Sequence, residues 1–430
     1  MKMGGTSRYA NAYRRSLPHD DRMSCQLPVP RVGDEEGWVR EHLSDLVDGE
    51  VKASGAIRGG QEAADTALNA FDVTGYAADR SEVYPIGRRG ASRLSPYIRH
   101  GLIPLPRAWS SVAYGPARDV AKFRDELLWQ EYARHMYART GGTASSIRYA
   151  VTARTAPVAP NWIDGMACFD LVVGELKQDG WMVNQTRMWF ASHWSVRHGH
   201  GWRDGEDLFF RHLLDGSRAA NRLGWQWTVG AGTGKAYGFA RAQVERRAPG
   251  LCGSCALRTA CPIQSYSDDP ELQRVPAPAG VLGDPDPKAT AGPDEAIPTE
   301  SVNRVWITAE SLGDDDPAMS AHPDAPVTFV FDEALLGRLM LAGKRLVFLT
   351  ECLADLATRR EMQVWRGDPV DVLSGGGVAT TYAPVPGWSS RADLIKPSSV
   401  HPWPWLVKPH GGAAGSFSAW RKGAGLDKRR

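Results

Sequence analysis

The sequence predicts a protein of mixed class, with a helical domain followed by a small α/β domain. Helical periodicity dominates from Gly59 to about Asp268, and a stretch crowded with Pro, Gly, Ala and Asp (Val275–Thr299) follows it. After that stretch, short β-rich runs alternate with an amphipathic helix. A chain of 430 residues, 42% of them hydrophobic, is long enough to bury the cores of two domains.

Apolar residues at spacings of three and four predict helices in the first part of the chain, at Gln61–Phe71, Val120–Tyr137, Ile163–Leu176, Trp181–Trp194 and Leu208–Leu214. A shorter amphipathic helix is expected at Glu35–Leu46. The chain therefore divides into an N-terminal extension (1–56), a helical domain (57–270), a linker (271–300) and an α/β domain (301–430).

The last domain shows the order strand, strand, helix, strand, which is typical of a small and partly parallel sheet. The expected elements are strands at Val302–Ala309, Val327–Asp332 and Met362–Trp365 and a helix at Lys344–Arg359. Beyond them no regular strand or helix pattern follows, so we expect a truncated domain.

Charge and cysteine content exclude several classes of protein. The formal net charge is +2, no run of eighteen apolar residues occurs, and the polar, Arg-rich N-terminus has no apolar core of a secretory signal. Six cysteines in so long a chain do not form the framework of a small secreted protein. We expect a cytoplasmic monomer without a membrane segment.

Tryptophan is unusually frequent, with 16 in the chain and eight of them between Trp129 and Trp227. Such an excess indicates either one aromatic core or a site that stacks planar rings and moves electrons. The segment GASRLSPYIRHG (Gly90–Gly101) leads from a turn into a helix, whose start either binds a phosphate or is merely capped. A buried Asp215 beside Arg187 requires the two to pair.

Three further segments, ELLWQEYARH (Glu126–His135), GWMVNQTRM (Gly180–Met188) and the helix ending at Trp227, complete the pattern. Together and in this order they resemble the FAD-binding domain of the DNA photolyase/cryptochrome family over about 59–267. The resemblance implies a helical cavity that holds a folded FAD. Its phosphates and ribose would contact Tyr76, Ser92, Leu94 and Ser95. Arg187 and Asp215 would pair against the flavin ring, with Asn221 near its N5 atom.

The same resemblance implies a pocket for a cyclobutane pyrimidine dimer flipped out of DNA, lined by Glu126, Trp129, Asn184, Met188 and Trp227. In the family, the reduced flavin absorbs blue light and passes an electron to the dimer, whose ring then opens. Glu126 would protonate or hydrogen-bond the dimer. The (6-4) photolyases place His at positions 184 and 188, so the resemblance favours cyclobutane dimers. Gln130, Gln185 and Ser217 depart from the family pattern.

Trp225 and Trp202 match the two inner members of the family's electron-transfer chain, whereas the outer tryptophan has no evident counterpart. Between Pro85 and Ala150, 11 Lys and Arg stand against 4 Asp and Glu, a local excess of seven positive charges. This excess is either a solvated helix face or the surface that binds DNA.

Three cysteines with metal-ligand spacing end in a Cys-Pro pair: Cys252, Cys255 and Cys261. Cys168 is the candidate for a fourth ligand, because the iron–sulfur subgroup of photolyases places a cysteine on the corresponding helix. We expect a [4Fe–4S] cluster, with zinc as the alternative.

The α/β domain resembles the photolyase antenna domain, which in the family precedes the flavin domain. Here it follows, so the order is circularly permuted, and its shortness gives little ground to expect an antenna chromophore. The sequence thus predicts a light-dependent DNA photolyase, a carbon–carbon lyase whose partner is dimer-containing DNA. The alternatives are a cryptochrome-like blue-light receptor without repair activity and a non-photochemical, metal-stabilised DNA-binding protein.

Overall fold

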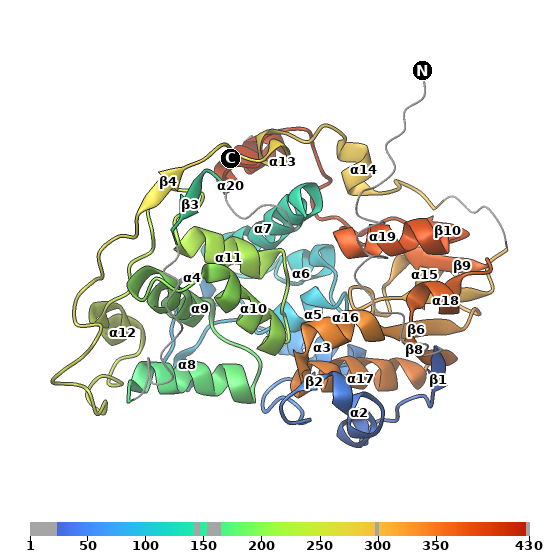
Figure 1. Cartoon of the computed structure of the whole chain (residues 1–430), viewed down its shortest axis with the longest axis horizontal. Coiled ribbons are helices and arrows are strands. Elements are labelled where there is room, and N and C mark those ends of the chain that lie inside the picture. Colours follow the sequence, from blue (N-terminus) through green and yellow to red (C-terminus); the bar gives the residue numbers. More distant parts are fainter. Residues whose placement is uncertain (1–23, 142–146, 153–164, 297–300, 427–430) are drawn as a thin grey trace.

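The computed structural model describes residues 24–141, 147–152, 165–296 and 301–426. Helices fill one side of the molecule and a twisted sheet with its own helices fills the other (Figure 1). Residues 1–23 of the expected extension and Trp162 lie outside the described residues.

The helical unit follows the predicted periodicity closely. Its elements are α3 (Gln61–Ala70), α4 (Tyr76–Asp79), α5 (Ser95–Arg99), α6 (Leu105–Ser111), α7 (Ala117–Thr140), α8 (Ala167–Gln178), α9 (Asn184–Ala191), the π-helical turn η3 (Ser192–Arg197), α10 (Trp202–His212), α11 (Ala220–Thr228) and α12 (Arg241–Arg247). Helix α11 packs against both α7 and α9, so the residues of three sequence segments meet in one region.

The second unit is built on a six-stranded sheet in the order β1-β8-β6-β5-β9-β10. Its strands are β1 (Cys25–Leu27), β5 (Arg304–Ile307), β6 (Val327–Asp332), β8 (Met362–Gly367), β9 (Val378–Thr381) and β10 (Ser399–His401). All neighbouring pairs are parallel except β1 with β8. The five parallel strands, counted along the chain, therefore lie in the order 3-2-1-4-5, which is the order of a doubly wound sheet.

The expectation of a truncated α/β unit was wrong. Strands β9 and β10 and the helix between them, α19 (Pro386–Ile395), complete the sheet. These strands are only four and three residues long and are too short for an alternating pattern to show in the sequence. The other helices of this unit are α15 (Pro317–Ala321), α16 (Glu333–Leu339), α17 (Gly343–Ala357) and α18 (Pro369–Leu373).

Segments outside the two expected domains also have regular structure. Strand β1 pairs antiparallel with β8, and α2 (Glu35–Leu43) packs on α17, so the described part of the expected extension lies against the α/β unit (Figure 1). A short strand, β2 (Val47–Asp48), pairs with β7 (Leu341–Ala342). The unit expected to be all-helical contains β3 (Tyr149–Val151), paired with β4 (Leu272–Arg274) of the expected linker. The linker also forms α13 (Ala279–Leu282) and α14 (Pro287–Ala291), which contact α7.

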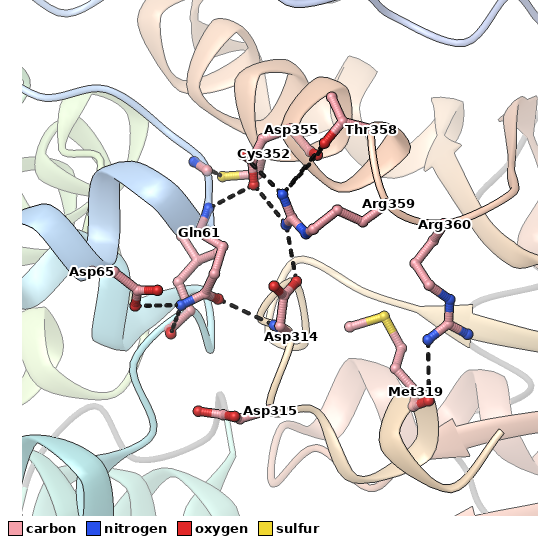
Figure 2. A network of polar contacts seen from close by, with 12 residues as sticks. Gln61, Asp65, Asp314, Asp315, Met319, Cys352, Asp355, Thr358, Arg359 and Arg360 are labelled. Atoms are coloured by element: carbon pink, nitrogen blue, oxygen red, sulfur yellow. Dashed lines mark hydrogen bonds and ion pairs between the residues drawn. The ribbon is translucent and has the colours of Figure 1, made fainter. Parts of the chain in front are cut away.

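A polar network joins the start of the helical unit to the α/β unit (Figure 2). The backbone N–H of Gln61, at the first turn of α3, donates to Asp355 Oδ2 of α17 at 2.7 Å. The Gln61 side chain accepts from the Asp314 N–H at 3.1 Å, and Arg359 bridges Asp314 and Asp355, each at 2.9 Å. One hydrophobic core also runs through both units, from Leu94 and Phe123 to Phe331 and Leu346.

A second core lies within the helical unit and contains several of the most deeply buried aromatic side chains, including Trp189, Trp225 and Phe239. The tryptophan excess is therefore in part a packing feature. Among the described helices, none combines the length and apolar character that a membrane crossing requires.

Candidate functional site

The predicted ion pair is present at the centre of the helical unit. Arg187, on the first turn of α9, donates from Nη2 to Asp215 Oδ2 at 2.8 Å. The same guanidinium reaches Asn221 Oδ1 at 3.4 Å and the Met182 carbonyl at 3.1 Å. Both Asp215 and Asn221 are buried, at 7% and 6% exposure.

This pair leaves two polar atoms without a protein partner. Asp215 Oδ1 and Asn221 Nδ2 are buried and make no hydrogen bond within the described structure. A buried acceptor and a buried donor left unpaired are costly, about 1–3 kcal/mol each, unless another molecule satisfies them. The arrangement is therefore suited to a ligand that offers both a donor and an acceptor, as a flavin ring does.

The residues expected at the FAD phosphates and ribose lie along α4 and at the start of α5. Ser95 begins α5, and its hydroxyl accepts from the Trp181 indole N–H at 3.2 Å. The Ser92 hydroxyl accepts from the backbone N–H of Leu94 at 3.4 Å, and Leu94 itself is fully buried. Tyr76 is buried at 8% exposure, and this burial raises the pKa of its phenol.

Three helices supply the residues expected to line the lesion pocket: Glu126 and Trp129 from α7, Asn184 and Met188 from α9, and Trp227 from α11. Trp227 is 40% exposed and Asn184 is exposed, so both reach the surface. A partly exposed indole ring such as that of Trp227 is the kind of group on which a base stacks.

Glu126 and Trp129 have partners that the sequence did not indicate. The Glu126 carboxylate forms ion pairs with Arg80 at 3.2 Å and Lys122 at 2.7 Å. Trp129 stacks on Phe417 of α20 (Phe417–Gly423), with 4.0 Å between ring centroids and 15° between ring planes. One face of Trp129 is thus covered by α20, and a base could use only the other face or the edge.

Trp225 is buried at 2% exposure, and Trp202 at 9%. The aromatic neighbours of Trp225 are Phe209, at 5.1 Å, and Phe190, at 6.3 Å, and Phe190 in turn stacks on Trp194 at 6.0 Å. The Arg203 guanidinium carbon lies 4.5 Å from the ring centroid of Trp202.

The four candidate metal ligands line one pocket at the edge of the helical unit, where α8 and α12 lie (Figure 1). Cys168 is on α8, and Cys252, Cys255 and Cys261 are on the loop after α12. Burial raises the pKa of the Cys168 thiol to about 12, and the three other cysteines raise it further. In the part of the chain that is described, however, no three His, Cys, Asp or Glu side chains stand in a metal-binding arrangement.

A second pocket, which sequence reasoning missed, lies between the helical unit and the carboxyl ends of β5 and β9. Among its lining residues are Arg134 of α7, Glu310, Asp316 and Trp403. Asp316 caps α15 by accepting from the Ala318 and Met319 N–H groups, and burial raises the pKa of its carboxyl to about 6.

Residues 123–249 match the sequence profile described as the FAD binding domain of DNA photolyase. A deoxyribodipyrimidine photo-lyase of Thermus thermophilus is 30% identical over 247 residues, covering 53% of this chain and 56% of that protein. Over these residues the chain is therefore similar to the FAD-binding domain of DNA photolyases. The matched profile begins in α7 and ends just after α12, so it contains Arg187, Asp215 and Asn221.

A second relative, the deoxyribodipyrimidine photo-lyase of Vibrio cholerae, is 31% identical over 159 residues, covering 34% of each chain. The chain therefore spans about half or less of the length of these relatives. The crystal structure of a class III photolyase from Agrobacterium tumefaciens is 25% identical and covers 39% of this chain and 37% of that one. Its TM-score against this chain is 0.36.

Proposed function

We propose that this protein is a light-dependent flavoprotein that splits cyclobutane pyrimidine dimers in DNA. The observation that carries the proposal is the Arg187–Asp215 pair inside the matched FAD-binding segment, with Asp215 Oδ1 and Asn221 Nδ2 buried and unpaired beside it. These atoms fit the edge of a flavin ring, which carries both donors and acceptors.

FAD would lie between α4, α5, α9 and α11. Tyr76, Ser92, Leu94 and Ser95 would hold its phosphates and ribose, and Arg187, Asp215 and Asn221 would hold the ring. Reduced FAD would supply the light-excited electron that opens the dimer. The chain's own part is to bind and orient the flavin, to keep water from it and to present the lesion.

The lesion would enter beside the exposed ring of Trp227, with Asn184 and Met188 of α9 beneath it. Glu126 would hydrogen-bond the dimer, and its ion pairs with Arg80 and Lys122 hold its side chain in place until the lesion arrives. The excess of positive charge between Pro85 and Ala150 supports DNA as the partner, because phosphate contacts dominate the affinity of such proteins.

Trp225 would be the electron donor nearest to the flavin, with Trp202 next to it in the chain of donors. The depth at which Trp225 is buried supports this role, since a donor that reduces a buried flavin must itself lie in the core. The Arg203 cation lies over the Trp202 ring and disfavours the positive charge that this ring carries after it gives up an electron. Electron transfer through Trp202 would therefore require the charge to pass quickly to a further donor.

We further propose that residues 57–270 form the flavin domain and residues 301–430 the antenna-type domain, in permuted order. The sheet order 3-2-1-4-5 supports an antenna-type domain. In this arrangement the segment before the helical domain would return to the α/β unit, and the contacts of β1 and α2 with that unit support such a path of the chain.

Cys168, Cys252, Cys255 and Cys261 would hold a [4Fe–4S] cluster, with zinc as the alternative. All four cysteines line one pocket, and this supports the assignment, because iron–sulfur clusters are held by Cys thiolates. The cluster would tie α8 to the loop after α12 in the way that a structural metal does.

The decisive experiment for the function is repair of synthetic oligonucleotides that contain one cyclobutane dimer, with and without blue light. A matched oligonucleotide with a (6-4) lesion and a dark sample serve as controls. We expect light-dependent loss of the cyclobutane dimer only. A protein that binds FAD and is photoreduced but repairs neither lesion would refute the repair function and favour a photoreceptor.

The cluster is tested by iron and zinc analysis of the purified protein and of two single variants. Cys252→Ser should lose the metal and, for an iron–sulfur cluster, the broad brown absorbance. Cys352→Ser is the matched control, because Cys352 is buried in α17 and outside the pocket. Metal-free protein, or equal metal content in both variants, would contradict the assignment.

A further inference from the structure

The loop that carries Asp215 is held in place by residues from outside its own segment. The Gly216 carbonyl accepts from Arg99 Nε of α5 at 3.1 Å and from Arg345 Nη2 at 3.3 Å. On the other side of Asp215, the Leu214 carbonyl faces the His100 ring at 3.0 Å. Of these groups, Arg345 alone comes from the α/β unit, where it lies in the first turn of α17.

Arg345 is buried at 4% exposure and makes a second contact beside the site. Its Nη1 donates to the Phe210 carbonyl, and its guanidinium carbon lies 4.9 Å from the centre of the Phe210 ring. Burial lowers the pKa of Arg345 to about 9, and the negative charge of Asp215 opposes this shift. The buried cation therefore has an electrostatic partner in Asp215, the residue that directly precedes the Gly216 carbonyl it bonds.

Two glycines make room for α17 against this backbone. A Cβ atom on Gly216 would lie 2.7 Å from Arg345 Nη1, and one on Gly180 would lie 2.6 Å from Lys344 Cδ. Gly180 precedes α9, and its carbonyl accepts from the Leu214 N–H at 2.8 Å. The start of α17 thus lies directly on the two backbone segments that lead to Arg187 and Asp215.

We propose that Arg345 is a positioning residue of the flavin site, through which the α/β unit completes a site that lies in the helical unit. By bonding the carbonyls of Phe210 and Gly216, it fixes the backbone of Asp215 and so the direction of the free Asp215 Oδ1. This inference rests on the proposed function, because it assumes that Asp215 meets a flavin.

The test compares Arg345→Met with a matched control in the full-length chain. Arg360→Met is that control: Arg360 also donates to backbone carbonyls, those of Met319, His322 and Ala325 at 3.2, 2.8 and 3.0 Å, but within the α/β unit (Figure 2). For each protein, the FAD dissociation constant is measured by fluorescence titration, and the urea midpoint is measured without FAD.

Arg345→Met should weaken FAD binding about ten- to a hundredfold, the range expected for lost hydrogen bonds to a charged group. It should also broaden the absorption band of the bound flavin at saturation. Arg360→Met should lower the urea midpoint while its FAD dissociation constant stays within about twofold of wild type. Equal FAD affinity in Arg345→Met and wild type, or equal weakening in both variants, would overturn the inference.

Arg345→Lys keeps the buried charge but cannot reach both carbonyls with a planar fork. It therefore serves where Arg345→Met does not fold, and we expect it to regain stability while FAD binding stays several-fold weaker. Full recovery of FAD binding in Arg345→Lys would exclude positioning by the fork. If the unmodified protein binds no FAD, the proposed function itself fails, and this inference with it.

Discussion

Gly205 decides how closely the indole ring of Trp225 can approach α10, and its replacement by alanine tests that packing. A Cβ atom built on Gly205 would lie 2.6 and 2.7 Å from the Cζ3 and Cζ2 atoms of Trp225. Real Cβ atoms do not approach other atoms so closely, so the ring or the helix must shift. Trp225 is 2% exposed and packs on Phe190 and Phe209, so its ring has little space to move into.

Two opposing effects set the size of the change. Alanine in place of glycine stabilises a helix by about 0.5–1 kcal/mol, whereas inserting a carbon into a filled core destabilises by about 1–3 kcal/mol. Gly205→Ala should therefore lower the free energy of unfolding by up to about 2 kcal/mol. The same substitution at a helical glycine with open space around it should raise that free energy by about 0.5–1 kcal/mol.

Two matched controls are available in the same unit. Gly174 in α8 and Gly224 in α11 have no atom within 4 Å of a built Cβ, and Gly224 directly precedes Trp225. Urea unfolding followed by circular dichroism should rank Gly205→Ala below wild type and both controls above it. If Gly205→Ala were as stable as Gly174→Ala, Trp225 would not be packed against α10 as described.

Three further changes test other parts of the structure. Asp215→Asn leaves the Arg187 guanidinium without a countercharge, so we expect urea unfolding to show a free energy of unfolding lower by about 3 kcal/mol. FAD titration of the same variant should show weaker binding. Wild-type values in both measurements would contradict the pairing. Burial raises the pKa of Asp316 from 3.8 to about 6, so wild-type stability should fall as the pH rises from 4 to 6, by about 3 kcal/mol. Asp316→Asn should remove this fall and be more stable than wild type at pH 8 but not at pH 4, and parallel stability curves would refute the shift. Trp225→Phe should slow light-driven reduction of bound FAD, recorded as bleaching of its visible absorbance, and an unchanged rate would remove Trp225 from the donors.

The sequence predicted what depends on regular spacing. Helices α3 and α7 and strand β6 follow from the recurrence of apolar residues, and the pairing of Arg187 with Asp215 follows from the cost of burying either charge alone. The sequence spacing predicted that three of the four cysteines at the metal pocket lie together. The fourth, Cys168, was predicted only from the family resemblance.

What the sequence could not predict are contacts between distant segments that no local pattern records. Phe417 lies 288 positions after Trp129, and neither residue's neighbours indicate that the two rings stack. The sequence around Arg345 predicts a helix but does not indicate whether the side chain is buried. Its burial depends on the packing of α17 against Gly216, which is distant in the sequence. Strands β9 and β10 were missed because four and three residues are too few to show the alternation of apolar and polar residues that marks a strand.

The pairing of β1 with β8 has a consequence for how this protein folds as it is made. Cys25 of β1 pairs opposite Arg366 of β8, so β1 cannot pair until about 340 further residues have been synthesised. At roughly 5–20 residues per second, the delay is about 20–70 s, during which the whole helical unit emerges from the ribosome. Such non-local pairing slows folding and leaves an unpaired strand exposed in the meantime. Strand β1 is three residues long, and this brevity limits the chance that it pairs with another nascent chain before its own partner arrives.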